Sequence, residues 1–323
     1  MARFDLTRRR LLKLAAAAPV LTLPAAPALA QLGGPVAGGN TAHYRFSLGS
    51  MTLTVVSDGY LGLPVNALAV NASDTDVAAF LQAHYLSQNE NYSHTNHLVI
   101  DTGSAVVLVD IGSGNRFMPT AGRLMDNLRS AGIDPASITH VVFTHAHPDH
   151  IWGIRDDFDE PLLPDAEYVI GGAEHDWWLQ DGLASSVAPE DQQFVVGAVN
   201  SLTTEGVDWV RGMDGYEVVP GVRMIDSPGH TLNHMSIVLE SDGKQLIALG
   251  DCMTHAYISV ERPDWHSGRD IDGDMASATR KRLLDMAAAD RIAVLGYHFP
   301  FPGVGHIMRD GDGYRFVPAM WTW

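Results

Sequence analysis

Positions 144–150 of this chain read Thr-His-Ala-His-Pro-Asp-His, and this dense group of ligand-type side chains constrains the fold more than any other feature. The segment follows a short apolar run that predicts a buried strand, so the strand delivers these side chains to one loop. His145 and His147 are two positions apart and project to the same side of an extended segment. Asp149 and His150 are then available to a second cation beside the first. Because imidazole and carboxylate groups bind zinc and neighbouring divalent metals, the loop predicts a metal site at a strand end.

Three further ligand-type residues stand at the ends of predicted strands, namely His230, Asp251 and His298. Taken singly, a histidine or aspartate at a strand end is more often a structural polar residue. Together with the loop they supply five imidazoles and two carboxylates. That set is large enough for two cations, with a carboxylate available to bridge them. We therefore expect a dinuclear site.

Short apolar strands and amphipathic helices alternate along the chain. Strands are predicted at His43–Leu48, Met51–Ser57, His97–Asp101, Ala105–Asp110, Ile138–Thr144, Met235–Leu239, Gln245–Leu249 and Ile292–Tyr297. Helices are predicted at Asp74–Leu86 with Ser73 as N-cap, at Phe117–Ala131 with Gly132 as C-cap, and at Ala276–Ala289. Since no linker divides residues 43–323, the alternation favours a single α/β domain over that range.

Composition excludes several classes of protein. Hydrophobic residues make up 46% of the chain and charged residues 18%, which is ample material for a core and unlike a disordered chain. The single cysteine, Cys252, excludes a disulfide framework and a zinc site built from several thiolates. The formal net charge of -17 argues against a nucleic-acid partner, because binding to phosphates needs a basic surface.

Residues 1–30 have the pattern of a targeting sequence. Arg8–Arg10 precede a run rich in alanine and leucine, and a small-x-small cleavage signal ends at Ala30. The run is too short and too rich in proline to span a bilayer stably. It resembles a twin-arginine export signal, with an ordinary secretory signal as the alternative. We expect cleavage after about Ala30, a flexible arm over residues 31–42 and a soluble periplasmic protein without membrane contact, with the twin-arginine export machinery as the precursor's partner.

The ligand set resembles that of the metallo-β-lactamase-fold hydrolase superfamily, over essentially the whole chain after the signal. The resemblance implies an α/β fold, a four-layer αβ/βα sandwich with a dinuclear metal site at the sheet edge. It also implies how the ligands divide: His145, His147 and His230 hold one metal, Asp149, His150 and His298 hold the other, and Asp251 bridges them. Asp110 is implied to orient a ligand histidine, with the capping of a turn before Gly112 as the alternative.

Within the superfamily the chain is most similar to the methyl parathion hydrolase and lactonase branch. Residues 296–306 and 313–318 carry that similarity, whereas residues 252–274 match the branch poorly. The resemblance implies that Trp178 and Phe194 line the substrate pocket, with core packing as the alternative, and it implies a homodimer. His255, four residues after Asp251, is a further candidate for the pocket.

The pattern of ligands predicts a hydrolytic mechanism. Two divalent metals acidify a shared water, and the resulting hydroxide attacks a carbonyl carbon or a phosphorus. We expect Asp149 to orient this hydroxide and carry a proton towards the leaving group, and Asp251 to keep the metals together. Zinc is the expected metal, although the ligand set also accepts manganese, iron or cobalt.

Little lysine or arginine lies near the ligand segments, which favours neutral substrates: lactones including acyl-homoserine lactones, aryl esters, and phosphotriesters such as methyl parathion. This inference holds unless distant residues such as Arg262 or Arg269 fold over the site. The alternatives are a β-lactam hydrolase and a non-catalytic metal-binding scaffold. Loss of activity on chelation, restored by zinc or manganese, distinguishes an enzyme from a scaffold.

Overall fold

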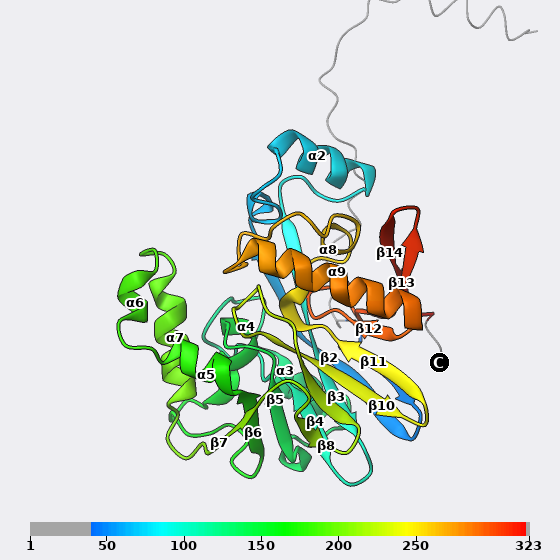
Figure 1. Ribbon diagram of the computed structural model, residues 1–323. Coiled ribbons are helices and arrows are strands. Elements are labelled where there is room, and N and C mark those ends of the chain that lie inside the picture. The colour runs from blue at the N-terminus through cyan, green and yellow to red at the C-terminus, as the bar shows by residue number, and fades with distance from the viewer. Residues whose placement is uncertain (1–39, 321–323) are drawn as a thin grey trace, which may run out of the picture. The chain divides into compact units, whose positions relative to one another are not determined.

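The computed structural model describes residues 40–320, and its strands form two seven-stranded sheets (Figure 1). The expected signal at residues 1–30, and the arm up to residue 39, lie outside the described residues. None of the helices in the described part of the chain is long and apolar enough to cross a bilayer.

The first sheet contains the strands of the amino-terminal half in chain order. They are β1 (His43–Leu48), β2 (Met51–Leu63), β3 (Asn91–Asp101), β4 (Val106–Val109), β5 (His140–Phe143), β6 (Glu167–Gly171) and β7 (Trp209–Gly212). Strands β1 to β4 pair antiparallel, and β4 to β7 pair parallel. The parallel strands have almost continuous apolar sequences because both of their faces are covered.

The second sheet contains the strands of the carboxyl-terminal half. They are β8 (Glu217–Val219), β9 (Val222–Asp226), β10 (Met235–Ser241), β11 (Lys244–Ala248), β12 (Ala293–Leu295), β13 (Val304–Asp310) and β14 (Gly313–Pro318), in the reverse spatial order. A hairpin turn at Asp242 joins β10 to β11, and Asp242 adopts the positive φ of 51° that such a turn requires. Only the pair β11 and β12 is parallel among the described strands of this sheet.

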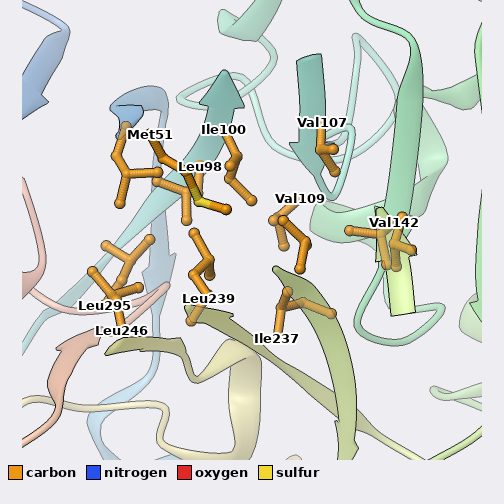
Figure 2. Packing of buried hydrophobic residues seen from close by; sticks show 14 of the residues in the cluster. Met51, Leu98, Ile100, Val107, Val109, Val142, Ile237, Leu239, Leu246 and Leu295 are labelled. Carbon is orange, nitrogen blue, oxygen red and sulfur yellow. The ribbon is translucent and has the colours of Figure 1, made fainter. Parts of the chain in front are cut away.

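The two sheets pack face to face through a shared aliphatic core. Figure 2 shows side chains of the first sheet, such as Leu98 and Val109, opposite Ile237, Leu239 and Leu246 of the second. Burial of this apolar surface is the main force that holds the sheets together.

Helices cover the outer face of each sheet. On the first sheet lie α3 (Leu124–Ser130), α4 (Pro148–Ile151), α5 (Gly172–Trp178) and α7 (Gln192–Leu202). On the second lie α8 (Ile258–Glu261) and α9 (Gly273–Asp290), the latter drawn in orange in Figure 1. The remaining short helices are α2 (Asp74–Ala83), α6 (Leu183–Ser186) and the 3₁₀ turns at Val65–Ala67, Pro135–Ser137, Trp152–Ile154 and Gly250–Cys252. The layers are therefore helix, sheet, sheet, helix, and the expected four-layer αβ/βα sandwich is confirmed.

One predicted helix begins later than expected, and the helix predicted at Asp74–Leu86 ends earlier, at Ala83. The periodicity of Phe117–Ala131 predicts a continuous helix, but α3 begins only at Leu124. The reason is long-range: the backbone N–H of Tyr60 in β2 donates to the carbonyl of Thr120 (3.1 Å), and Thr120 lies in a turn that Ala121 N–H closes on the carbonyl of Met118 (3.1 Å). The helix then starts where the buried carboxylate of Asp58 accepts from the N–H of Leu124 (2.6 Å). By contrast, α2 begins at Asp74 as predicted, with the hydroxyl of Ser73 accepting from Asp76 N–H.

Candidate metal centre

All of the predicted ligands follow the carboxyl ends of strands. The histidine-rich loop follows β5, whereas His230, Asp251 and His298 follow β9, β11 and β12. The pairing of β9 to β12 makes these three strands run in one direction. Residues far apart in sequence therefore meet at one edge of the sandwich.

Asp110, at the end of β4, shapes the loop after β5. It adopts a positive φ of 58°, a conformation that aspartate tolerates better than most residues. Its carboxylate accepts from the backbone N–H of Thr144 (2.8 Å), from the Thr144 hydroxyl (2.9 Å) and from His150 Nδ1 (2.8 Å). All three residues are buried. Asp110 thus lies where it orients a histidine of the ligand set.

His145, His147 and His230 form the first group of converging ligands. His145 Nε2 lies 3.0 Å from His147 Nδ1, and this Nδ1 lies 2.9 Å from His230 Nε2. Three imidazole nitrogens thus face one point.

Asp149, His150 and His298 form the second group. His150 Nε2 and His298 Nε2 each lie 3.4 Å from Asp149 Oδ2. Asp251 lies between the two groups, because its carboxylate is 3.3 Å from His230 Nε2, 3.3 Å from His150 Nε2 and 3.0 Å from His298 Nε2. This is the place of a bridging ligand.

Unpaired atoms show that the site fits cations. Asp149 Oδ2, His150 Nε2 and Asp251 Oδ1 are buried and lack a hydrogen-bond partner among the described residues. Burying a polar atom without a hydrogen-bond partner costs free energy, unless a bound ion or water takes the place of that partner. Here the three atoms point at the same small space, and their donor types are those that zinc prefers. The residues present therefore fit two divalent cations.

The electrostatics of the site favour the ligand forms of several groups. Burial, reinforced by the neighbouring imidazoles, holds the pKa of His145 and of His147 well below the usual range, so both rings are neutral. Burial alone would raise the pKa of Asp251, but His298 and other imidazoles hold it well below its ordinary value. Neutral imidazoles and an ionised carboxylate are the forms that bind a cation.

Four of the five ligand rings have a hydrogen bond on their far side, and for His150 this is the bond to Asp110. His298 Nδ1 donates to the carbonyl of His94 (2.7 Å), and His145 Nδ1 donates to the hydroxyl of Thr144 (3.0 Å). His230 Nδ1 donates to Asp270 Oδ1 (3.1 Å). Such bonds fix the tautomer, so the other ring nitrogen is left free to coordinate.

The backbone of the two aspartate ligands is held as well. His234 Nε2 accepts from the backbone N–H of Asp251 (2.9 Å), while its Nδ1 donates to Ser227 (2.7 Å). His234 therefore has a structural role, holding the backbone at Asp251. Tyr297 donates from its hydroxyl to the carbonyl of Asp149 (2.6 Å).

Two acids beside the ligands were not predicted from the sequence. Glu174 is fully buried in α5 and accepts from Ala146 N–H (3.2 Å), Trp178 Nε1 (2.7 Å) and the Thr231 hydroxyl (2.8 Å), so it ties the loop to the segment after His230. Asp270 is equally buried beside His230. Neither lies in a recognisable spacing pattern, because both act through tertiary contacts.

A cleft of about 610 Å³ opens over the ligands. Asp149, Asp251 and the histidines 147, 230 and 298 line its polar part. Its walls are mostly apolar: Leu61, Leu63, Pro64, Ala67, Leu68, Phe117, Met118, Trp177, Trp178, Val187, Ala188, Phe194, Val195 and Ile271. The two predicted aromatic residues therefore reach the cleft, and the ring of Trp178 meets that of His147 edge-on at 5.7 Å.

Arg269 is the one arginine or lysine among the described residues that line the cleft. Its guanidinium lies 5.3 Å from the ring centre of Phe194 and 3.3 Å from Asp191. Arg269, one of the two distant arginines considered from the sequence, thus does reach the cleft, but its guanidinium is already paired with the carboxylate of Asp191. Arg269 therefore weakens the argument for neutral substrates. It does not remove that argument, because the charge of Arg269 is compensated by Asp191.

His255 lies elsewhere than expected. The described lining of the cleft includes its neighbour Thr254 and not His255. The imidazole turns away because its Nδ1 accepts from the backbone N–H groups of Tyr257 (3.2 Å) and Ile258 (3.1 Å), which caps the start of α8. Burial, with a contribution from His84, lowers its pKa to about 4.

This partly buried histidine makes stability depend on pH. Its pKa is about 4 in the folded state and about 6.5 when unfolded, so the unfolded state binds more protons between these values and stability falls as pH falls through that window. His255→Asn keeps an acceptor for α8 but does not titrate. We expect the loss of unfolding free energy from pH 7 to pH 5 to be about 2 kcal/mol smaller in the variant, measured by urea titration. Parallel losses in both proteins would contradict this.

Comparison with known proteins gives consistent matches. A family model described as the metallo-beta-lactamase superfamily matches residues 92–296. An N-acyl homoserine lactonase from Bacillus sp is 26% identical over 204 residues, which are 62% of this chain and 68% of the lactonase. A second, from Bacillus cereus, is 24% identical over 203 residues, with the same shares covered.

Two solved structures are similar in fold. AidC, a dizinc quorum-quenching lactonase in complex with a product, has a TM-score of 0.82 and 24% identity, covering 87% of this chain and 98% of AidC. The hydrolase AbOPH, of the beta lactamase superfamily, has a TM-score of 0.80 and 24% identity, covering 88% of this chain and 99% of AbOPH.

Proposed function

Because this chain belongs to the metallo-β-lactamase superfamily, we propose that it is a dinuclear metal-dependent hydrolase that opens lactone rings, with N-acyl homoserine lactones as the main substrate class. The observation that carries the proposal is the two-cation ligand set at the bottom of a largely apolar cleft. The lactonases among its relatives and structural neighbours support the choice of substrate.

Different residues of the chain have different roles in the proposed reaction. The two groups of ligands hold the cations, which when bound supply the Lewis acidity that activates water and polarises the lactone carbonyl. Asp251 holds the two groups of imidazoles in a fixed relation. Asp149 lines the cleft, so its carboxylate is available to take a proton from the attacking water and to deliver it to the departing ring oxygen.

The apolar walls of the cleft are suited to bind the acyl chain of the substrate. Aliphatic side chains from β2 and the turn after it, including Leu61, Leu63 and Leu68, face the cleft together with Phe117 and Phe194. An alkyl chain loses water on entering such a space, and each buried methylene contributes about 0.8 kcal/mol. We therefore expect affinity to increase with acyl length until the cleft is filled.

Aryl esters and phosphotriesters are a second candidate class. The lining of the cleft, as far as the structure describes it, includes the phenylalanines Phe117 and Phe194 and the tryptophans Trp177 and Trp178. Rings of this kind stack on a flat aromatic leaving group. The same site then activates water against the phosphorus or the ester carbon.

A hydrolysis panel on the purified, metal-analysed protein tests the proposal. It compares butyryl, hexanoyl and decanoyl homoserine lactones with an aryl ester, methyl parathion and a cephalosporin. We expect the decanoyl and hexanoyl lactones to have the highest kcat/KM, with the activity lost on chelation and restored by zinc. Turnover of the cephalosporin alone would contradict the choice of substrate. Lactone opening that survives complete metal removal would contradict the mechanism.

We also propose that the precursor is exported by the twin-arginine route. The support is the Arg8–Arg10 cluster ahead of the Ala- and Leu-rich run and the cleavage signal that ends at Ala30. Cell fractionation with amino-terminal sequencing is expected to find a periplasmic protein beginning near Gln31. Retention of the full-length chain inside the cell would contradict export.

A further inference from the structure

The segment from Pro263 to Asp272 contacts both the cleft and a metal ligand. On one side it lines the cleft, through Ser267, Gly268 and Arg269. On the other side it runs along the ligand His230, because Ile271 N–H donates to the carbonyl of His230 (2.9 Å) and Asp272 N–H donates to that of Gly229 (3.0 Å). The cleft wall and a metal ligand are therefore parts of one hydrogen-bonded unit.

Asp270 lies at the centre of this unit. Its side chain is fully buried, and its two oxygens have different partners. Oδ1 accepts from His230 Nδ1 (3.1 Å), whereas Oδ2 accepts from the N–H of Ser267 (3.0 Å) and from Arg280 (3.1 Å). One oxygen thus faces the metal centre, and the other faces the segment.

Arg280 anchors the unit to α9. It is 1% exposed and makes three hydrogen bonds, to Asp270, to the carbonyl of Pro263 (3.1 Å) and to the carbonyl of Trp265 (2.9 Å). A fully buried arginine is costly unless its charge is paired and its N–H groups are satisfied. Because the 263–272 segment supplies all of these partners, any movement of that segment exposes or unpairs the guanidinium.

Helix α9 also holds the residues next to the ligand. The hydroxyl of Thr279 donates to the carbonyl of Pro228 (2.6 Å). Gly229 lies so close to α9 that a Cβ there would be 2.1 Å from the nitrogen of Ala276. Because the backbone around His230 is held in this way, only the rotation of its ring and its tautomer remain free. The hydrogen bond to Asp270 determines both.

We propose that Asp270 is a positioning residue for the metal ligand His230, and that the Asp270–Arg280 pair couples cation binding to the ordering of the 263–272 cleft wall. A cation that binds His230 holds the ring in the orientation that also satisfies Asp270. Through Arg280 this stabilises the segment that contacts substrate. The inference rests on the metal site and not on the choice of lactones, so it holds whichever ester the cleft accepts.

The test measures zinc affinity and amide hydrogen exchange, not turnover. Asp270→Ala removes the acceptor for His230, and we expect zinc binding, measured by competition with a chromogenic chelator, to weaken by about 10–100-fold. Asp270→Asn keeps an acceptor of the same shape and is expected to lose less. Asp264→Ala, in the same segment but on an exposed side chain that pairs with Lys281 of α9, serves as the matched control and is expected to bind zinc like the wild type.

Hydrogen exchange tests the coupling. In the wild type, zinc is expected to slow exchange of the amides of 263–272, and in Asp270→Ala and Arg280→Met this slowing is expected to disappear while β10 and β11 stay protected. If Arg280→Met does not fold, Asp270→Asn provides the same comparison with a smaller effect. Zinc affinity within two-fold of the wild type in Asp270→Ala would overturn the positioning role. Slowing by zinc that is undiminished in these variants would overturn the coupling.

Discussion

Asp251→Ala is expected to bind one zinc ion or fewer where the wild type binds two, and to lose more than about 100-fold in kcat/KM for the preferred lactone. The carboxylate lies within 3.3 Å of His230 and His150 and 3.0 Å of His298, so it is the side chain that both groups of ligands share. Without it the two cations lose their common anionic ligand and repel each other more strongly. Metal analysis after desalting, together with steady-state kinetics, measures both effects.

The backbone at this position does not depend on the carboxylate. The backbone N–H of Asp251 donates to His234 Nε2, and this bond does not involve the Asp251 side chain. The alanine variant therefore retains the turn. Asp274→Ala removes the same charge from a side chain that is 99% exposed in the first turn of α9, and it is expected to keep full zinc content and activity. Full zinc content with unchanged turnover in Asp251→Ala would remove the bridging role.

Asp110→Ala is expected to lower the free energy of unfolding of the metal-free protein by roughly 3 kcal/mol. The buried carboxylate accepts from three donors on Thr144 and His150, and all three lose their partner together. Alanine at a φ of 58° adds a backbone cost of about 1 kcal/mol. Urea unfolding of the apoproteins measures the difference without a contribution from bound metal.

Asp110→Asn is the matched variant, since asparagine tolerates a positive φ and keeps one oxygen for the N–H of Thr144. We expect it to lose roughly half as much stability as the alanine variant. In both variants His150 loses the carboxylate that fixes its ring, so zinc affinity is expected to fall by about 10–100-fold. An alanine variant as stable as the wild type would show that Asp110 does not shape the loop.

The ligand set was predictable because most of it is local in sequence. Four of the seven ligands lie within six residues, and the spacing of His145 and His147 determines how they project. The others stand at strand ends, which an α/β fold brings to one edge. Resemblance to a known superfamily then supplied the division of ligands, and the structure brings His145, His147 and His230 together in one group and Asp149, His150 and His298 in another.

Features that depend on tertiary contacts were not predictable. Asp270 and Glu174 have no sequence signature, since their partners His230 and Ala146 lie 40 and 28 residues away. The start of α3 depends on Asp58, which is 66 residues before Leu124. Nor does local sequence reveal that the imidazole of His255 turns away from the cleft.

Titration of the metal-free protein with zinc tests the central claim most directly. Opening of hexanoyl homoserine lactone is followed as zinc is added in steps, with the bound metal counted at each step. Activity is expected to be absent without metal, to rise with added zinc and to level off at two bound ions per chain, because both ligand groups and Asp251 are needed together. Full activity without metal, or a plateau at one bound ion, would contradict a dinuclear hydrolase.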